Sequence, residues 1–121
     1  MAQAREALEG AELLAQRALW TSCVNRLYYA CFYAFTAVLA DRGVRTTKHT
    51  EVRSALNRDF VRTGVVSKEL GSFYNRLFRR RHEGDYTDFV RFDGAQVRPW
   101  VKTAREFIDS VEALMEPDAS A

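Results

Sequence analysis

Hydrophobic residues recur along most of this chain at intervals of three and four, the spacing that places them on one face of an α-helix. No stretch shows the strict alternation that is typical of a half-buried strand. The pattern predicts four long helices and one short helix, at about residues 4–19, 22–42, 48–60, 68–84 and 94–116. We therefore expect an all-α fold, an antiparallel up-and-down bundle of four long helices plus one short helix. Residues 1–116 form its single domain, and residues 117–121 form a frayed tail.

Residues that commonly cap helices mark the predicted helix starts. Thr21 or Ser22 can begin the second helix, and Thr47 can begin the third, because a side-chain oxygen there accepts from an unpaired backbone N–H. Ser67 and Asp93 are expected to act in the same way before the fourth and fifth helices.

Two glycines and one proline mark further boundaries. Gly43 is expected to end the second helix, because glycine readily adopts the left-handed backbone of that position. Gly64 marks the loop after the third helix. Pro99 is harmless in a first turn, but it would remove a backbone hydrogen bond and kink the last helix if that helix begins as early as Ala95.

The predicted second helix is apolar nearly all the way round, so both of its sides need a cover. One stripe is an ordinary core face, whereas the other carries aromatic rings with polar tips and one guanidinium. This second stripe consists of Ser22, Arg26, Tyr29, Tyr33 and Thr36. It suits a ligand pocket or protein interface in which Arg26, Tyr29 and Tyr33 bind, and it equally suits a second core face satisfied inside the bundle. Homodimerisation fits both interpretations.

The apolar stripe of the predicted fourth helix continues into charged residues. After Leu70, Tyr74 and Leu77, the next inward positions are Arg81 and Asp85. An inward arginine needs a partner, and Asp85 lies four residues later on the same face. The pair indicates either a functional site or an internal ion pair that only fixes the register of the bundle.

A cluster of cationic residues surrounds this pair. It comprises Arg76, Arg79, Arg80, Arg81 and His82. Such mutual repulsion is tolerated best beside phosphates or carboxylates. His82 could act as an acid or base near neutral pH, or it could be an ordinary exposed histidine. His49 begins the short third helix, where an anion could bind, but a lone histidine at that position is expected to face solvent.

Charge is strongly polarised along the chain. Residues 42–81 hold eleven basic and three acidic side chains, a net charge of +8, whereas the rest of the 121 residues carry −6. A basic middle between acidic flanks favours an anionic partner such as RNA or a nucleotide. The alternative is that the two kinds of segment pair with each other within the bundle or a dimer.

The two cysteines and the hydropathy of the chain indicate its cellular compartment. Cys23 and Cys31 lie eight residues apart in one predicted helix, about 12 Å along its axis, and so cannot form a disulfide with each other. Zinc-site spacings are absent, and no segment has the pattern of a signal peptide or a membrane span. We expect a cytoplasmic protein with no membrane association, no bound metal and no cofactor.

Three blocks of the sequence together resemble the HEPN family. They are NRLYYACFYAFTAVLADRG at 25–43, KHTEVRSALNRDFVRTG at 48–64 and LGSFYNRLFRRRHEGDYTDF at 70–89. The chain is most similar to the small stand-alone prokaryotic branch, which carries an N-R-x-Y-Y-A block on the second helix and an R-x-x-x-D-Y block ending the fourth. Here these blocks begin at Asn25 and at Arg81 and end at Ala30 and at Tyr86.

The resemblance implies a helical bundle, commonly dimeric, with a polar motif at a cleft between protomers. Many members of the family are metal-independent ribonucleases of toxin, antiphage or RNA-processing systems, and several are encoded beside a nucleotidyltransferase antitoxin. Others are binding modules. Catalytic members use an R-x4-6-H motif, but here Tyr86 occupies the histidine position counted from Arg81. Arg76 and His82 have an allowed spacing, although Arg76 lies off the inward stripe.

Three hypotheses follow. The first is a dimeric ribonuclease-type toxin or RNA-processing protein in which Arg81, with His82 or Asp85, acts on RNA phosphodiesters. The second is a non-catalytic RNA-, nucleotide- or partner-binding module, for example one paired with a nucleotidyltransferase. In it Arg26, Tyr29, Arg81 and Asp85 would hold an interface or a phosphate without cleaving anything. The candidate binding residues also include Tyr33, Arg76 and Tyr86. The third is a structural helical adaptor, which requires the acidic flanks to neutralise the basic middle.

Overall fold

The computed structural model describes residues 1–82 and 92–115, and every regular element in these ranges is a helix. Its elements are α1 (Ala2–Gln16), α2 (Trp20–Asp41), α3 (His49–Ala55), η1 (Leu56–Val61), α4 (Lys68–His82) and α5 (Gly94–Glu112). The predicted all-helical fold with a short third helix is thus confirmed. The predicted C-terminal tail and the end of the predicted fourth helix lie outside the described residues.

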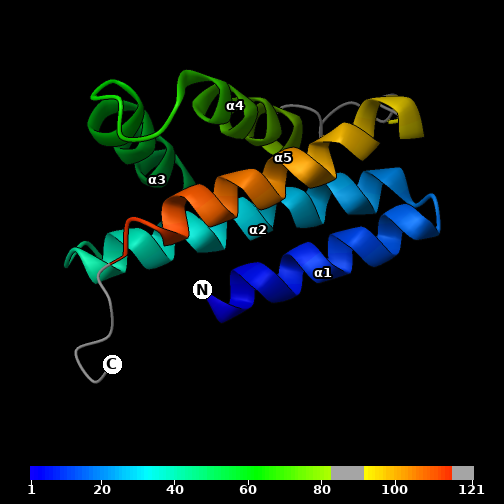
Figure 1. Ribbon diagram of the computed structural model, residues 1–121, viewed down its shortest axis with the longest axis horizontal. Coiled ribbons are helices and arrows are strands. Elements are labelled where there is room, and N and C mark those ends of the chain that lie inside the picture. Colours follow the sequence, from blue (N-terminus) through cyan, green and yellow to red (C-terminus); the bar gives the residue numbers. More distant parts are fainter. Residues whose placement is uncertain (83–91, 116–121) are drawn as a thin grey trace.

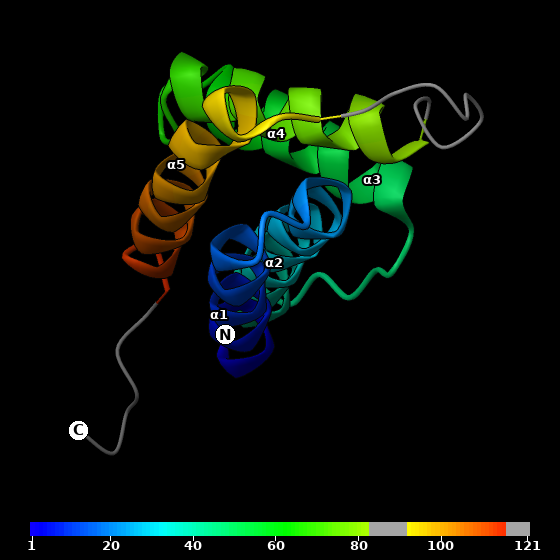
Figure 2. The same cartoon turned by 90° about the vertical axis from the view of Figure 1, so that its right-hand side faces the viewer.

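Helix α2 is the central element of the bundle (Figure 1). It packs against α1 through a short turn and against α5 along its length, and it also contacts α3 and α4. Figure 2 shows α4 running across the layer formed by α1, α2 and α5 rather than along it. This crossing brings the last turn of α4 over the middle of α2.

Ion pairs fix the relative direction of α1 and α5. The guanidinium Nη2 of Arg5 lies 2.8 Å from Oδ1 of Asp109 and 2.8 Å from Oε1 of Glu112. At the other end, Arg105 pairs with Glu12. Early residues of α1 therefore meet late residues of α5, and the two helices are antiparallel.

The core consists of apolar side chains from all the helices, and α2 contributes the largest share. The predicted core stripe of α2 is confirmed, because Cys23, Leu27, Cys31 and Phe35 are fully buried. The second stripe is different, since Arg26, Tyr29 and Tyr33 are only half-buried. One face of α2 is therefore only partly covered by the described residues.

Local chemistry explains several of the helix boundaries. Asp93 caps α5 as predicted, because its carboxylate accepts from the backbone N–H of Gln96 at 2.8 Å. The Ser67 hydroxyl accepts from the N–H of Leu70 at 3.2 Å. Gly43 follows α2 with a φ of 84°, the left-handed conformation expected where glycine ends a helix.

Two of the predicted caps were wrong. Helix α2 begins at Trp20, and Leu19 precedes it without a side-chain cap, so Thr21 and Ser22 already lie inside the helix. The turn from α1 is closed instead by backbone bonds around Ala18, whose φ is 56°. Before α3, the hydroxyl of Thr46 rather than Thr47 accepts from the backbone N–H of Lys48, at 3.2 Å.

The predicted third helix consists of an α-helical part, α3, and a π-helical part, η1. In η1 the N–H of Arg62 donates to the carbonyl of Asn57, five residues earlier.

Helix α5 starts early enough to place Pro99 inside it, so no backbone N–H is available there for the carbonyl of Ala95. Within the described residues, no helix is long and apolar enough to cross a membrane.

Candidate functional site

A tyrosine on α2 and two histidines on different helices meet where α4 crosses α2. The side chain of Tyr28 is fully buried, and its Oη lies 2.7 Å from Nδ1 of His49 at the start of α3. The same oxygen lies 3.4 Å from Nε2 of His82 at the end of α4. The two imidazole centroids are 5.2 Å apart. We call Tyr28, His49 and His82 the histidine cluster.

Aromatic packing holds both histidines in place. The ring of His49 stacks on Phe32 of α2, with centroids 4.2 Å apart and planes 10° from parallel. The ring of His82 stacks on Phe78, one turn earlier on α4, at 4.3 Å. The expectation that His49 faces solvent was wrong, because Phe32 and Tyr28 cover a large part of its ring. Neither imidazole can turn away without losing these contacts.

The surroundings also set the protonation of the cluster. Burial lowers the pKa of His49, and the positive charge of Arg81 lowers it further. Burial raises the pKa of Tyr28 to about 12, so its phenol is neutral and keeps its proton. At neutral pH, His49 is therefore an uncharged imidazole that can accept a proton, with a neutral hydroxyl beside it.

Two guanidinium groups lie near one aromatic ring next to the cluster. The Cζ atoms of Arg26 and Arg81 lie 5.1 Å and 5.8 Å from the centroid of Tyr29. The ring of Tyr29 in turn lies 5.3 Å from that of Tyr28 and 5.7 Å from that of Tyr33. Arg26, Tyr29 and Arg81, predicted from separate stripes of two helices, therefore come together beside the histidine cluster.

The remaining predicted site residues have different positions. Arg76 is exposed and lies over Trp100 of α5, with its Cζ 5.9 Å from the ring centroid. Arg81 instead lies over Tyr29 of α2, so the side chains of Arg76 and Arg81 extend from different sides of α4. Asp85 and Tyr86 lie outside the described residues.

Sequence reasoning missed Tyr28 and His49 as members of the site. A signal for Tyr28 was available, because the core side of α2 surrounds a phenol that needs a hydrogen-bonding partner. The two histidines of the chain were the natural candidates for that partner. Nothing in the pattern identified His49 in particular, because its position depends on the path of the chain between α2 and α3.

The arrangement can support proton transfer beside an anion. It combines a neutral imidazole, a second imidazole held nearby and a guanidinium, which are the elements of general acid–base chemistry on a charged substrate. Among the described residues, no three His, Cys, Asp or Glu side chains are grouped as a metal site would require.

The comparisons with known proteins agree with this fold. A model of the HEPN domain family matches residues 1–114. The "UPF0332 protein" of Thermotoga maritima is 46% identical over 114 residues, which cover 94% of this chain and 86% of that protein. A protein of Methanocaldococcus jannaschii named "Putative toxin" is 29% identical over 84 residues, which cover 69% of this chain and 57% of that protein.

Proposed function

The chain belongs to the HEPN domain family, and from that premise we propose that it binds RNA at the histidine cluster and cleaves its phosphodiester bonds without a metal ion. The single observation that carries the proposal is the meeting of His49 and His82 around the Tyr28 hydroxyl, next to Arg81. The histidine expected five to seven residues after Arg81 by the family motif is absent. In this proposal His49 takes over its role from another helix.

The proposed reaction assigns one task to each group. The ribose 2′-hydroxyl attacks the adjacent phosphorus and loses its proton to the neutral His49. The bond from phosphorus to the 5′-oxygen breaks, and that oxygen receives a proton from His82. Arg81 stabilises the negative charge on the phosphate oxygens in the transition state. The products are a 2′,3′-cyclic phosphate and a 5′-hydroxyl.

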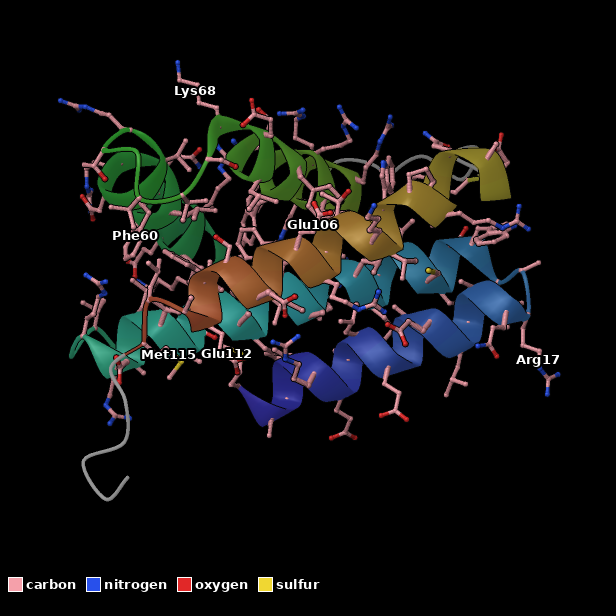
Figure 3. The ribbon with its side chains drawn as sticks, in the orientation of Figure 1. Arg17, Phe60, Lys68, Glu106, Glu112 and Met115 are labelled. Carbon is pink, nitrogen blue, oxygen red and sulfur yellow. The ribbon has the colours of Figure 1, made fainter. Side chains whose placement is uncertain are left out.

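The distribution of charge supports an RNA partner. Of the ion pairs formed between described residues, none joins the basic segment 42–81 to the acidic flanks. Figure 3 shows nitrogen-tipped side chains extending from the outer side of α4, beginning with Lys68. An exposed row of cations next to the histidine cluster would attract a phosphate backbone.

The half-buried stripe of α2 supports a dimer. Arg26, Tyr29 and Tyr33 leave rings and a guanidinium partly exposed beside the cluster. In our proposal a second copy of the chain covers this stripe and deepens the RNA-binding cleft. Sedimentation of the protein and of Tyr33→Glu tests this part, because a dimer through α2 would dissociate when two buried carboxylates are introduced.

A biological role as a toxin extends the proposal. The name of the Methanocaldococcus relative supports it, and the family resemblance suggests a nucleotidyltransferase as the antitoxin. Expression of the chain alone should then arrest growth. Coexpression with a nucleotidyltransferase encoded beside it should restore growth.

A non-catalytic binding module is the second candidate function. The observation that favours it is Tyr86 at the position where the family motif has a histidine. In that case Arg26, Tyr29 and Arg81 would hold a phosphate or a partner protein without cleaving anything.

The experiment that separates these functions is incubation of the protein with labelled total RNA in EDTA, followed by mapping of the ends. His49→Asn and His82→Gln each keep a nitrogen near the position of the ring nitrogen that faces Tyr28. We expect both variants and Arg81→Ala to lose cleavage, while Arg17→Ala in the distant α1–α2 turn retains it. Intact RNA with the parent protein would reject the ribonuclease. RNA binding that Arg81→Ala abolishes would then establish the binding module.

A further inference from the structure

A second polar site lies between η1 and α4, on the side of α4 away from Tyr29. It is an open pocket lined by Arg53, Ser54, Asn57, Asn75 and Arg79. Two of its five lining residues are arginines, and none is acidic. No ion pair between described residues involves either Arg53 or Arg79. The pocket therefore concentrates positive charge that the described part of the chain leaves uncompensated.

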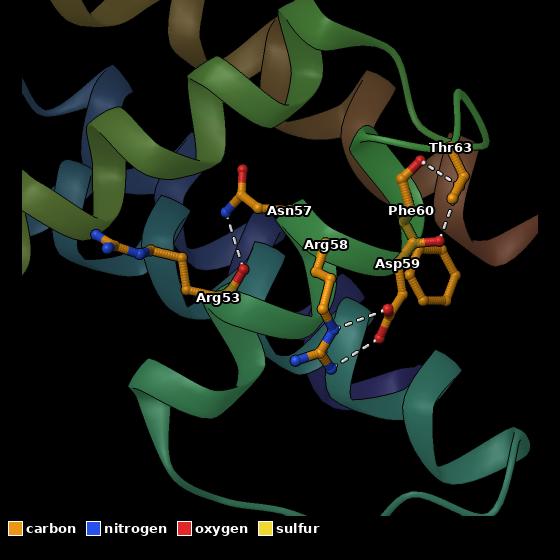
Figure 4. A network of polar contacts seen from close by, with 6 residues as sticks. All are labelled: Arg53, Asn57, Arg58, Asp59, Phe60 and Thr63. Atoms are coloured by element: carbon orange, nitrogen blue, oxygen red, sulfur yellow. Dashed lines mark hydrogen bonds and ion pairs between the residues drawn. The ribbon is translucent and has the colours of Figure 1, made fainter.

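Two side-chain amides that line the pocket bond to each other. The Nδ2 of Asn57 donates to Oδ1 of Asn75 at 2.9 Å, and the Nδ2 of Asn75 donates to Oδ1 of Asn57 at 3.0 Å. The Asn57 amide also donates to the carbonyl of Arg53 at 2.8 Å, as Figure 4 shows. Both N–H groups of Asn57 are thus engaged, whereas Asn75 keeps one N–H for a ligand.

The π-helix explains why these amides meet. Asn57 lies in η1, whose wider turn changes the direction of its side chains relative to an α-helix. Close packing of η1 on α4 completes the pocket, since a Cβ added to Gly71 would lie 2.6 Å from Cγ2 of Val61. The donors of the pocket therefore sit on a fixed framework and not on a loop.

The pocket is separated from the histidine cluster by one aromatic ring. The Cζ of Arg53 lies 4.4 Å from the centroid of Phe78, and His82 stacks on the same ring at 4.3 Å. A strand with one phosphate at the cluster can therefore place another of its phosphates in the pocket.

We propose that the pocket formed by Arg53, Asn57, Asn75 and Arg79 is a second phosphate-binding subsite, which holds the RNA strand next to the phosphodiester at the histidine cluster. This inference rests on the proposed function, because the ligand is the same strand. It adds a requirement for length: a substrate with a single phosphate cannot fill both sites.

Binding of 2′-O-methyl RNA tests this subsite separately from cleavage, because the blocked hydroxyl cannot attack. The probes are a labelled 2′-O-methyl oligonucleotide and the corresponding dinucleotide with one phosphate. Arg79→Gln is the test variant, since this exposed side chain can be changed without disturbing the core. Arg17→Gln is the matched control, because Arg17 is also an exposed arginine and lies at the end of the molecule opposite Phe60 of η1 (Figure 3).

We expect Arg79→Gln to bind the oligonucleotide about tenfold more weakly and to reduce the salt dependence of log K by about 0.7. Its affinity for the dinucleotide and the oligonucleotide affinity of Arg17→Gln should not change. Equal losses in the two variants, or no loss in Arg79→Gln, would overturn the subsite. Failure of the parent protein to bind the oligonucleotide would overturn both proposals. If the oligonucleotide binds as expected but natural RNA is not cleaved, only the ribonuclease proposal is rejected.

Discussion

The Oη of Tyr28 lies 2.7 Å from Nδ1 of His49, although the two residues belong to different helices and are twenty-one positions apart. The contact ties the start of α3 to the middle of α2. Because Tyr28 is fully buried and His49 is half-buried, the hydrogen bond contributes to stability as well as to the geometry of the site.

Removing the phenol oxygen tests this contact. Tyr28→Phe keeps the ring in the core but leaves Nδ1 of His49 without its partner. We expect the free energy of unfolding to fall by about 1–3 kcal/mol, measured by urea denaturation, and RNA cleavage to fall at the same time. Val38→Ala is the control, because it also removes fully buried atoms from α2 but leaves all three side chains of the histidine cluster unchanged. Equal losses of cleavage in both variants would contradict a specific role for Tyr28.

The pH dependence of stability should reveal His49. The fold holds its pKa below the value of about 6.5 that it has in an unfolded chain, so the unfolded chain binds more protons at mildly acidic pH. The stability that His49 contributes is therefore complete above about pH 6.5 and is lost as the pH falls through the folded pKa. Urea denaturation at a series of pH values should give a weaker acid dependence for His49→Asn.

Arg81 provides a second test of the same pKa. Its charge helps to lower the pKa of His49, so Arg81→Gln should raise that pKa. Histidine signals in NMR spectra would report this change directly. An unchanged titration of His49 in Arg81→Gln would show that burial alone sets its pKa.

Two glycines offer a matched pair of stability variants. Gly71→Ala should destabilise the protein by roughly 1–3 kcal/mol, because the new methyl group would lie 2.6 Å from Cγ2 of Val61. Gly10→Ala in α1 should be stabilising by up to about 1 kcal/mol, since the nearest atom would be 4.0 Å away. Thermal unfolding of both variants checks the close packing of η1 on α4. Equal effects would contradict it.

Both cysteines should be unreactive in the folded protein. Burial raises the pKa of Cys23 to about 11 and raises that of Cys31 further, so the reactive thiolate is scarce at neutral pH. A thiol reagent such as DTNB should react slowly with the native protein and rapidly in urea. Fast labelling under native conditions would indicate that the core around α2 opens readily.

The parts of the fold that depend on nearby residues could be predicted from the sequence. The periodicity indicated every helix, and Gly43 and Asp93 marked two of their ends because caps and left-handed turns are local effects. The π-helix at Leu56–Val61 could not be predicted, because the apolar spacing of this segment is that of an α-helix. Its hydrogen bonds to the fifth residue back leave no separate hydrophobic pattern.

The candidate site was predicted in part for the same reason. Arg26, Tyr29 and Arg81 each interrupted an apolar stripe, and such an interruption is visible in the sequence. The pairing of His49 with Tyr28, and of Asn57 with Asn75, depends on how α3 and α4 are placed over α2. No local pattern encodes that placement.

The three residues of the histidine cluster lie on α2, α3 and α4, and this has a consequence for the translation of the chain. Residues 1–48 can form the α1–α2 hairpin on the ribosome, but Tyr28 then has neither of its histidine partners. The cluster becomes complete only after His82 has left the exit tunnel and α4 has docked. Under the proposed function, translation products that stop before α4 should therefore have no cleavage activity, and only chains that extend through His82 could cleave RNA in the cell.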